Sequence, residues 1–170
     1  MKLRIYNCPD SDFKPFVEKA FNFYASELVP DKRIRNNCSV TIKFKNNLDV
    51  YGYASITGHN TKKQARKFLI ELHPGIGAKG ILMTLAHEMV HIKQYIYNET
   101  DDELSMWRGI CVDPTVDYWD HPWEIDAYGK ENGLIYNFAV KNALWEIFAD
   151  FINPTTPIIP EKIRWKCLPR

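Results

Sequence analysis

The sequence predicts an α+β fold in which a small, mostly antiparallel sheet packs against three helices. Three observations lead to this prediction. The 170 residues are enough for one domain and too few for two well-cored domains. Short strand-like stretches lie between residues 39 and 72. Two long helical patterns, at 78–97 and from 122 to about 151, follow them. We therefore treat residues 1–170 as a single domain.

The first part of the chain is predicted to contain the sheet and one helix. Leu3 and Ile5 alternate with polar residues, which favours a short strand at the start. Apolar residues then recur at helical spacing from Asp12 to about Leu28, and Pro30 ends this pattern. Three further strands are expected, the first two joined as a hairpin through residues 45–47: Ser39–Phe44, Val50–Ile56 and Ala65–Leu72.

The second part is predicted to be mainly helical. Residues 78–97 are apolar nearly all round, which is typical of a helix that runs through the middle of a fold. A polar connection and a short strand at 105–111 follow. Pro122 stands where the first residue of a helix is expected, and the helical pattern continues to about Phe151. The proline-containing tail, about residues 153–170, is expected to be extended.

Composition and charge argue against several classes of protein. Lys plus Arg number 22 and Asp plus Glu 21, and a net charge of +1 argues against a dedicated nucleic-acid binder, so nucleic acid is not expected as a partner. No apolar run approaches the roughly 18 residues of a membrane span. The first residues lack the apolar core of a signal peptide. These features favour a cytoplasmic protein without a membrane anchor.

One motif carries recognisable chemistry: His87-Glu88-Met89-Val90-His91, an HExxH sequence within the most apolar helical pattern. Histidines four residues apart on a helix lie on one face, so both imidazoles can bind one metal ion. Glu88 is rotated about 100° from His87, which places its carboxylate beside the metal rather than on it. With five His and ten Glu in the chain, chance predicts roughly 0.01 such motifs.

A catalytic zinc ion usually has three protein ligands, so a third must come from elsewhere in the chain. The preferred candidate is Glu124, in the first turn of the second long helix and 33 residues after His91. Ala127 follows one turn later, and its small side chain lets two helices approach closely. His121, on the segment that enters the same helix, is the alternative third ligand. The expected cofactor is Zn²⁺.

Together these residues resemble the zincin metallopeptidases. HExxH on one helix and a glutamate on a following helix are similar to the gluzincin branch, and Leu82 to Tyr128 resembles the SprT-like metallopeptidases of phages and bacteria. The resemblance implies a minimal zincin-like fold and a cytoplasmic location in a bacterial or phage-infected cell. It also implies a peptide or protein substrate held as an added strand at a sheet edge, for which we expect Ala65–Leu72.

Four further residues are candidates for roles around the metal. Zincin-type hydrolysis needs a donor for the developing oxyanion, and the candidates are Tyr128, Tyr118 and Arg108. Gln94 lies three residues after His91 and is a candidate hydrogen-bond partner for the site. Thermolysin-like gluzincins carry an aspartate four residues after the ligand glutamate; in this chain that position is Tyr128.

The leading functional hypothesis is a zinc metallopeptidase in which Glu88 acts as general base toward a metal-activated water. One alternative is a catalytically silent zincin-fold protein, structural or adaptor in role and possibly encoded by a phage. Another is an SprT-like protease that acts on DNA-associated proteins, with residues 162–166 as its basic cluster. The sequence does not indicate the oligomeric state.

Overall fold

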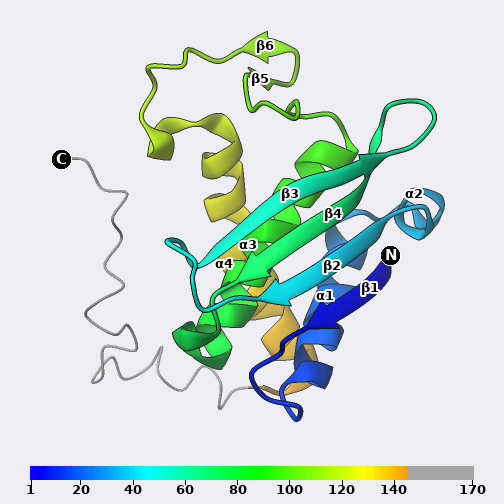
Figure 1. The fold of residues 1–170 in the computed structure, drawn as a ribbon, viewed down its shortest axis with the longest axis vertical. Coiled ribbons are helices and arrows are strands. Elements are labelled where there is room, and N and C mark those ends of the chain that lie inside the picture. Colours follow the sequence, from blue (N-terminus) through cyan, green and yellow to red (C-terminus); the bar gives the residue numbers. More distant parts are fainter. Residues whose placement is uncertain (145–170) are drawn as a thin grey trace.

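A computed structural model describes residues 1–144, in which four strands form one mixed sheet (Figure 1). The strands are β1 (Lys2–Tyr6), β2 (Ser39–Phe44), β3 (Gly52–His59) and β4 (Ala65–Leu72), in the order β1-β2-β4-β3. β1 pairs with β2 and β2 with β4 in parallel, whereas β3 runs antiparallel to β4. The α+β class is confirmed, and the sheet is mixed where the sequence predicted mostly antiparallel pairing.

The strand order corrects two expectations from the sequence. The predicted hairpin between 39–44 and 50–56 is wrong, because β4 lies between β2 and β3. The predicted edge strand 65–72 is wrong for the same reason, and the two edges of the sheet are β1 and β3. A physical reason lies in the side chains. Phe68, Ile70 and Leu72 of β4 are fully or almost fully buried, as suits a central strand, whereas β3 is rich in small residues and has a register shift after Ile56.

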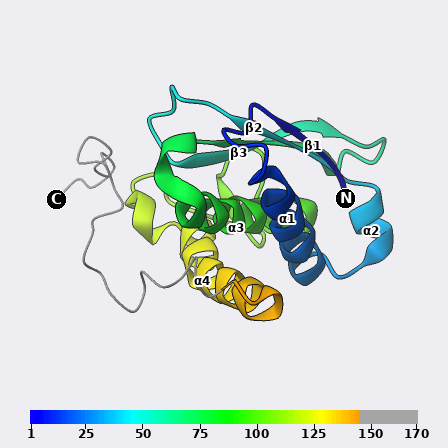
Figure 2. The ribbon, with the colours of Figure 1, turned by 90° about the horizontal axis from the view of Figure 1, so that it is seen from below.

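The three long helices lie on one face of the sheet (Figure 2). They are α1 (Lys14–Leu28), α3 (Gly77–Ile96) and α4 (Pro122–Asn142), while the short α2 (Lys32–Asn36) connects α1 to β2. α1 and α3 lie next to the sheet, and α4 packs mainly against α3 on the side away from it. α3 is thus covered by the sheet on one side and by α4 on the other, as its apolar sequence predicts.

Short elements connect these helices and strands. The 3₁₀ turn η1 (Pro74–Ile76) leads into α3, and the hairpin of β5 (Met106–Trp107) and β6 (Ile110–Cys111) replaces the single strand expected over 105–111. A second 3₁₀ turn, η2 (Tyr118–Asp120), precedes α4. The predicted end of the last helix near 151 and the tail from about 153 lie outside the described residues. Within residues 1–144, no helix is long and apolar enough to cross a membrane.

Phe138 joins α4 to α1 in the core, near the C-terminal ends of both helices. Its side chain is fully buried, and its ring lies 5.7 Å from that of Phe23 and 5.8 Å from that of Tyr24, both on α1. Aromatic rings at such distances stabilise a core beyond their buried area. α4 is therefore anchored at a point remote from its first turn, where Glu124 lies.

We predict that Phe138→Ala lowers the free energy of unfolding by about 3–5 kcal/mol, because it leaves a cavity between α1 and α4. Urea denaturation measures the change. Tyr136→Ala is the matched control, since Tyr136 lies on the same helix and is 60% exposed, and it should change stability by less than about 0.5 kcal/mol. Equal losses in the two variants would contradict this account of the core.

Candidate metal centre

The two histidines of the HExxH motif lie one turn apart on α3, on the side that faces α4. Their ring centroids are 4.7 Å apart, and the two Nε2 atoms approach to 3.0 Å. His87 is 8% exposed. Two imidazole nitrogens directed at one point inside a protein are the expected arrangement of metal ligands on an HExxH helix.

Glu124 completes the group from the first turn of α4, and its side chain is buried. Its Oε2 lies 3.3 Å from Nε2 of His87, and its Oε1 lies 3.5 Å from Nε2 of His91. Ligand atoms about 2.05 Å from a tetrahedral zinc ion are separated by roughly 3.3 Å. Among residues 1–144, His87, His91 and Glu124 are the one group of three or more such side chains close enough to hold a metal ion.

The hydrogen bonds around this group leave the ligand atoms available. Nδ1 of His87 lies 2.8 Å from Oε2 of Glu131, and Nδ1 of His91 lies 2.9 Å from Oε1 of Gln94. Because both partners are acceptors, each Nδ1 carries a proton, so the neutral form of each ring has its lone pair on Nε2, the atom that would bind a metal ion. Oε2 of Glu124 is buried 3.3 Å from Nε2 of His87, and it accepts no well-aligned hydrogen bond from any residue in 1–144. The donor set therefore fits Zn²⁺ and similar divalent ions.

Gln94 lies where the sequence placed it, next to His91, and it does more than contact that ring. Its Nε2 donates to the backbone oxygen of Trp123 at 2.9 Å and to Oδ2 of Asp126 at 3.2 Å. The fully buried Gln94 side chain thus connects His91 to the first turn of α4. This connection holds the second helix, and with it Glu124, against the HExxH helix.

Glu131 is the residue that the sequence analysis missed. It is 6% exposed and supports His87 in the way that an aspartate four residues after the ligand glutamate does in thermolysin-like enzymes. In this chain the carboxylate comes seven residues after Glu124, two helical turns on and therefore on the same face. The seven-residue spacing of Glu124 and Glu131 on one predicted helix could have identified it, but the sequence analysis considered only the position four residues after Glu124.

The charges of the group depend on one another. Burial opposes ionisation of Glu124, but hydrogen bonds and charges from His87 and His91 outweigh it and lower the pKa of Glu124 to about 2. Burial likewise lowers the pKa of His87, and the carboxylates of Glu124, Glu131 and Glu88 raise it to about 10. In the metal-free protein a proton on His87 therefore balances Glu124. A bound cation would take the place of that proton.

Glu88 lies on the sheet side of the group and is 5% exposed. Burial raises its pKa, while the two histidines and a hydrogen bond from the backbone of Ala54 act in the opposite direction. Gly52 makes room for it: a Cβ at Gly52 would lie 2.9 Å from Oε1 of Glu88 and 2.4 Å from Cγ2 of Thr84. A glycine at the start of the edge strand thus lets the Glu88 side chain lie between α3 and β3.

The other predicted site residues are divided between the centre and its surroundings. The ring of Tyr128 lies 4.5 Å from that of His87. Burial and the nearby charge of Glu124 raise the pKa of Tyr118, although 44% of the residue is exposed. Arg108 is directed away from the group: it contacts Glu99 at 3.5 Å and stacks over Trp107.

His121 is not part of the group that could hold a metal ion. Its ring stacks on that of Trp123, with centroids 4.5 Å apart, and its buried Nδ1 has no hydrogen-bond partner among the described residues. The geometry therefore favours Glu124 over His121 as the third ligand.

Comparisons of the chain with protein-family models, curated proteins and solved structures found no match. The resemblance to zincins thus depends on the HExxH motif and the residues around it.

We predict that Gly52→Ala destabilises the protein by about 1–3 kcal/mol and displaces the Glu88 side chain, because the new methyl group overlaps Thr84. Urea denaturation measures the loss. Gly58→Ala on the same strand is the control: its Cβ would meet only the flexible side chain of Lys67, at 3.0 Å, so the loss should stay below about 1 kcal/mol. A tolerated Gly52→Ala would contradict the close approach of β3 and α3.

We also predict that Glu131→Gln weakens zinc binding by about 10–100-fold, because an amide supports the orientation and basicity of His87 less well than a carboxylate. Competition with a chromophoric chelator measures the affinity. Glu18→Gln, an exposed change on α1, should leave zinc affinity unchanged. An unaltered affinity in Glu131→Gln would show that this carboxylate does not act on the metal site.

Proposed function

We propose that this protein is a zinc-dependent metallopeptidase, with His87, His91 and Glu124 as metal ligands and Glu88 as general base. The observation that carries the proposal is the position of Glu88. Its carboxylate lies next to the His–His–Glu group without belonging to it, buried between α3 and the edge strand. A site that only joined two helices would need no carboxylate there.

The cost of burying Glu88 supports the same conclusion. A buried carboxylate destabilises a fold unless it is paired or hydrogen-bonded, and burial raises the pKa of Glu88. A carboxylate with a raised pKa is a better proton acceptor near neutral pH. A zinc ion in this group would supply the electrophile, by polarising a substrate carbonyl and acidifying a water molecule. Glu88 would then take the proton and pass it to the leaving amine.

The edge strand offers a place for a peptide substrate. β3 pairs with β4 on one side only, and its N-terminal half contains Gly52, which packs against Glu88, and Ala54, whose backbone forms a hydrogen bond with it. A peptide that adds to the free edge of β3 by backbone hydrogen bonds would pass beside the general base. This assignment replaces the expected edge at residues 65–72, which the sheet buries between β2 and β3.

Among the predicted oxyanion donors, the geometry favours Tyr118. Burial and the charge of a proposed ligand, Glu124, raise the pKa of Tyr118, so its hydroxyl stays a proton donor near the centre at neutral pH. Arg108 pairs with Glu99 instead. Tyr128 packs against the ring of His87 and the ring of Trp119, which suits a positioning role for its aromatic face.

We predict that Glu88→Gln retains zinc but lowers cleavage of an unfolded protein such as casein by about 10²–10⁴-fold, because it removes the proton acceptor and leaves the ligands in place. His91→Ala should lose both zinc and activity, and Glu18→Gln should lose neither. Metal content is measured by atomic emission and cleavage by release of soluble peptides. If zinc-loaded wild type cleaves nothing, the peptidase proposal is wrong and the catalytically silent alternative stands. If wild type and Glu88→Gln cleave equally, Glu88 is not the general base and the proposed mechanism is wrong.

A further inference from the structure

The two halves of the described chain carry opposite charge. Residues 1–72 contain thirteen Lys and Arg and seven Asp and Glu, whereas residues 73–144 contain five and eleven. The net charge of +1 for the whole chain is therefore an average over two segments of opposite sign. The first segment forms the sheet, α1 and α2, and the second forms the metal centre and the loops around it. Charge asymmetry of this kind is a feature of proteins with a charged partner.

One face of the sheet is turned away from the helices (Figure 2), and part of the basic charge lies on this face. On each strand one set of alternate residues packs into the core, including Leu3, Val40 and Phe68, which are matched in register. Their neighbours along each strand must point to the other face. That face carries four exposed cationic residues: Lys2, Arg4, Lys43 and Lys67. We call it the open sheet face.

The register shows what lies between these cations. Lys2 is matched to Ser39 and then Lys67, and Arg4 to Thr41 and then Leu69. The third row runs from Tyr6 through Lys43 and Glu71 to Tyr53. The two tyrosines are 46% and 56% exposed and stand on the two edge strands. The face thus combines cations, short hydroxyl side chains and accessible aromatic rings.

The cations of the open sheet face are not neutralised within residues 1–144. None of the four forms an ion pair with a described carboxylate, and Glu71, the acidic residue of the third row, pairs with Lys45. Residues 145–170 contain four Lys and Arg against three Asp and Glu, so the rest of the chain provides no acidic segment to cover the face. The charge is available to a partner.

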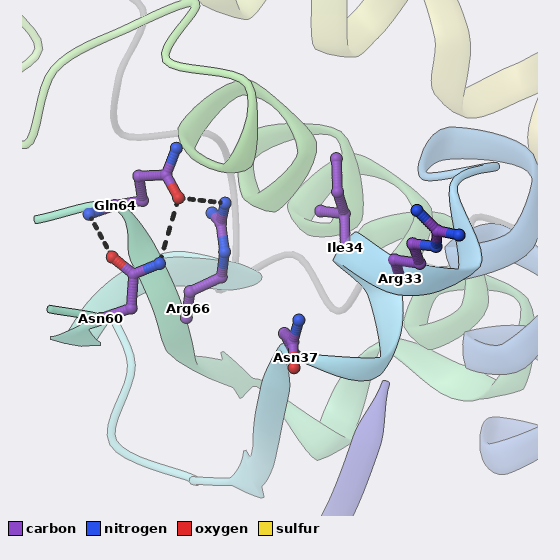
Figure 3. A pocket seen from close by; sticks show the side chains of 6 residues that line it. All are labelled: Arg33, Ile34, Asn37, Asn60, Gln64 and Arg66. Carbon is purple, nitrogen blue, oxygen red and sulfur yellow. Dashed lines mark hydrogen bonds between the residues drawn. The ribbon is translucent and has the colours of Figure 1, made fainter. Parts of the chain in front are cut away.

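A cavity of about 360 Å³ lies at the end of the sheet where β2 and β4 begin (Figure 3). Its lining contains no carboxylate and consists of Arg33, Ile34, Asn37, Asn60, Gln64 and Arg66. Arg66 is held in place by Oε1 of Gln64, which also accepts a hydrogen bond from Asn60. Arg33 lies on α2, on the other side of the cavity, and has no described hydrogen bond from its side chain. Arg66 alternates with the exposed Lys67 and also lies 3.4 Å from the backbone oxygen of Ile96 on α3, so this cavity is on the helix side and separate from the open sheet face.

We propose that the open sheet face binds single-stranded nucleic acid. Phosphates of the backbone would contact Lys2, Arg4, Lys43 and Lys67, and unpaired bases would stack on Tyr6 and Tyr53. Exposed rings beside cations on a flat sheet are the features that single strands use, and a paired duplex does not present its base faces. This surface is on the opposite side of the sheet from the metal centre, so the proposal does not depend on peptidase activity.

The test is fluorescence anisotropy of a labelled oligothymidylate with the zinc-loaded full-length protein at several salt concentrations. We expect saturable binding whose logarithmic salt dependence has a slope of about −3, as four phosphate contacts would give. Arg4→Gln and Lys43→Gln should each weaken binding several-fold and make the slope shallower. Tyr53→Ala should weaken binding by about 5–100-fold through lost stacking. Lys19→Gln, which removes one exposed charge on α1, should have little effect.

Three results would overturn the proposal. The first is no salt-dependent binding. The second is an equal loss in Lys19→Gln, which would mean diffuse attraction to the whole protein. The third is that a DNA duplex, polyglutamate or vesicles with anionic lipid bind more tightly than the oligothymidylate does, while Tyr53→Ala has no effect on binding. Circular dichroism confirms that each variant is folded, so a loss of binding is read as a surface effect.

Discussion

The structure depends on one constraint: several titratable side chains are buried between α3 and α4 and must satisfy one another. Two histidines come from α3, and the carboxylates of Glu124 and Glu131 come from α4. Neither helix can bury its own polar groups without the other, because an unpaired charge in the core costs several kcal/mol. The close contact of the helices, where Ala127 is fully buried, follows from this mutual dependence.

The sheet contributes the second half of the site. β3 is an edge strand rich in small residues, and a Cβ at its Gly52 would lie 2.9 Å from Oε1 of Glu88. The same strand therefore makes room for the proposed base and leaves a free edge beside it. A peptide added there would meet the proposed chemistry without any further rearrangement of the fold.

The inner face of the sheet is apolar and the open sheet face is basic. The peptidase proposal and the nucleic-acid proposal therefore concern opposite sides of the sheet. The inner face packs α1 and α3 and leads to the metal centre, whereas the open sheet face carries cations and tyrosines. Because successive side chains of a strand point to opposite faces, each short strand contributes apolar residues to the inner face and polar or charged residues to the open sheet face. A small domain can in this way present a buried reaction centre and a charged binding surface on opposite sides of one layer.

The sequence by itself determined the features that depend on local spacing. HExxH placed His87 and His91 on one helical face, and the apolar pattern of 78–97 predicted a central helix. Pro122 marked the start of α4, and with it the position of Glu124 in the first turn. These predictions succeed because a helix relates residues three and four apart by its own geometry, whatever it packs against.

Only the tertiary structure decided which distant segments meet. It placed β4 between β2 and β3, directed Arg108 to Glu99, and brought Glu131 to His87 across 44 positions of sequence. It also set Gly52 against Glu88, a contact that no local pattern marks. Strand order and helix–helix contacts are set by the burial of whole faces against one another. The free energy gained by this burial depends on two elements at once, so it cannot be predicted from the sequence of one element alone.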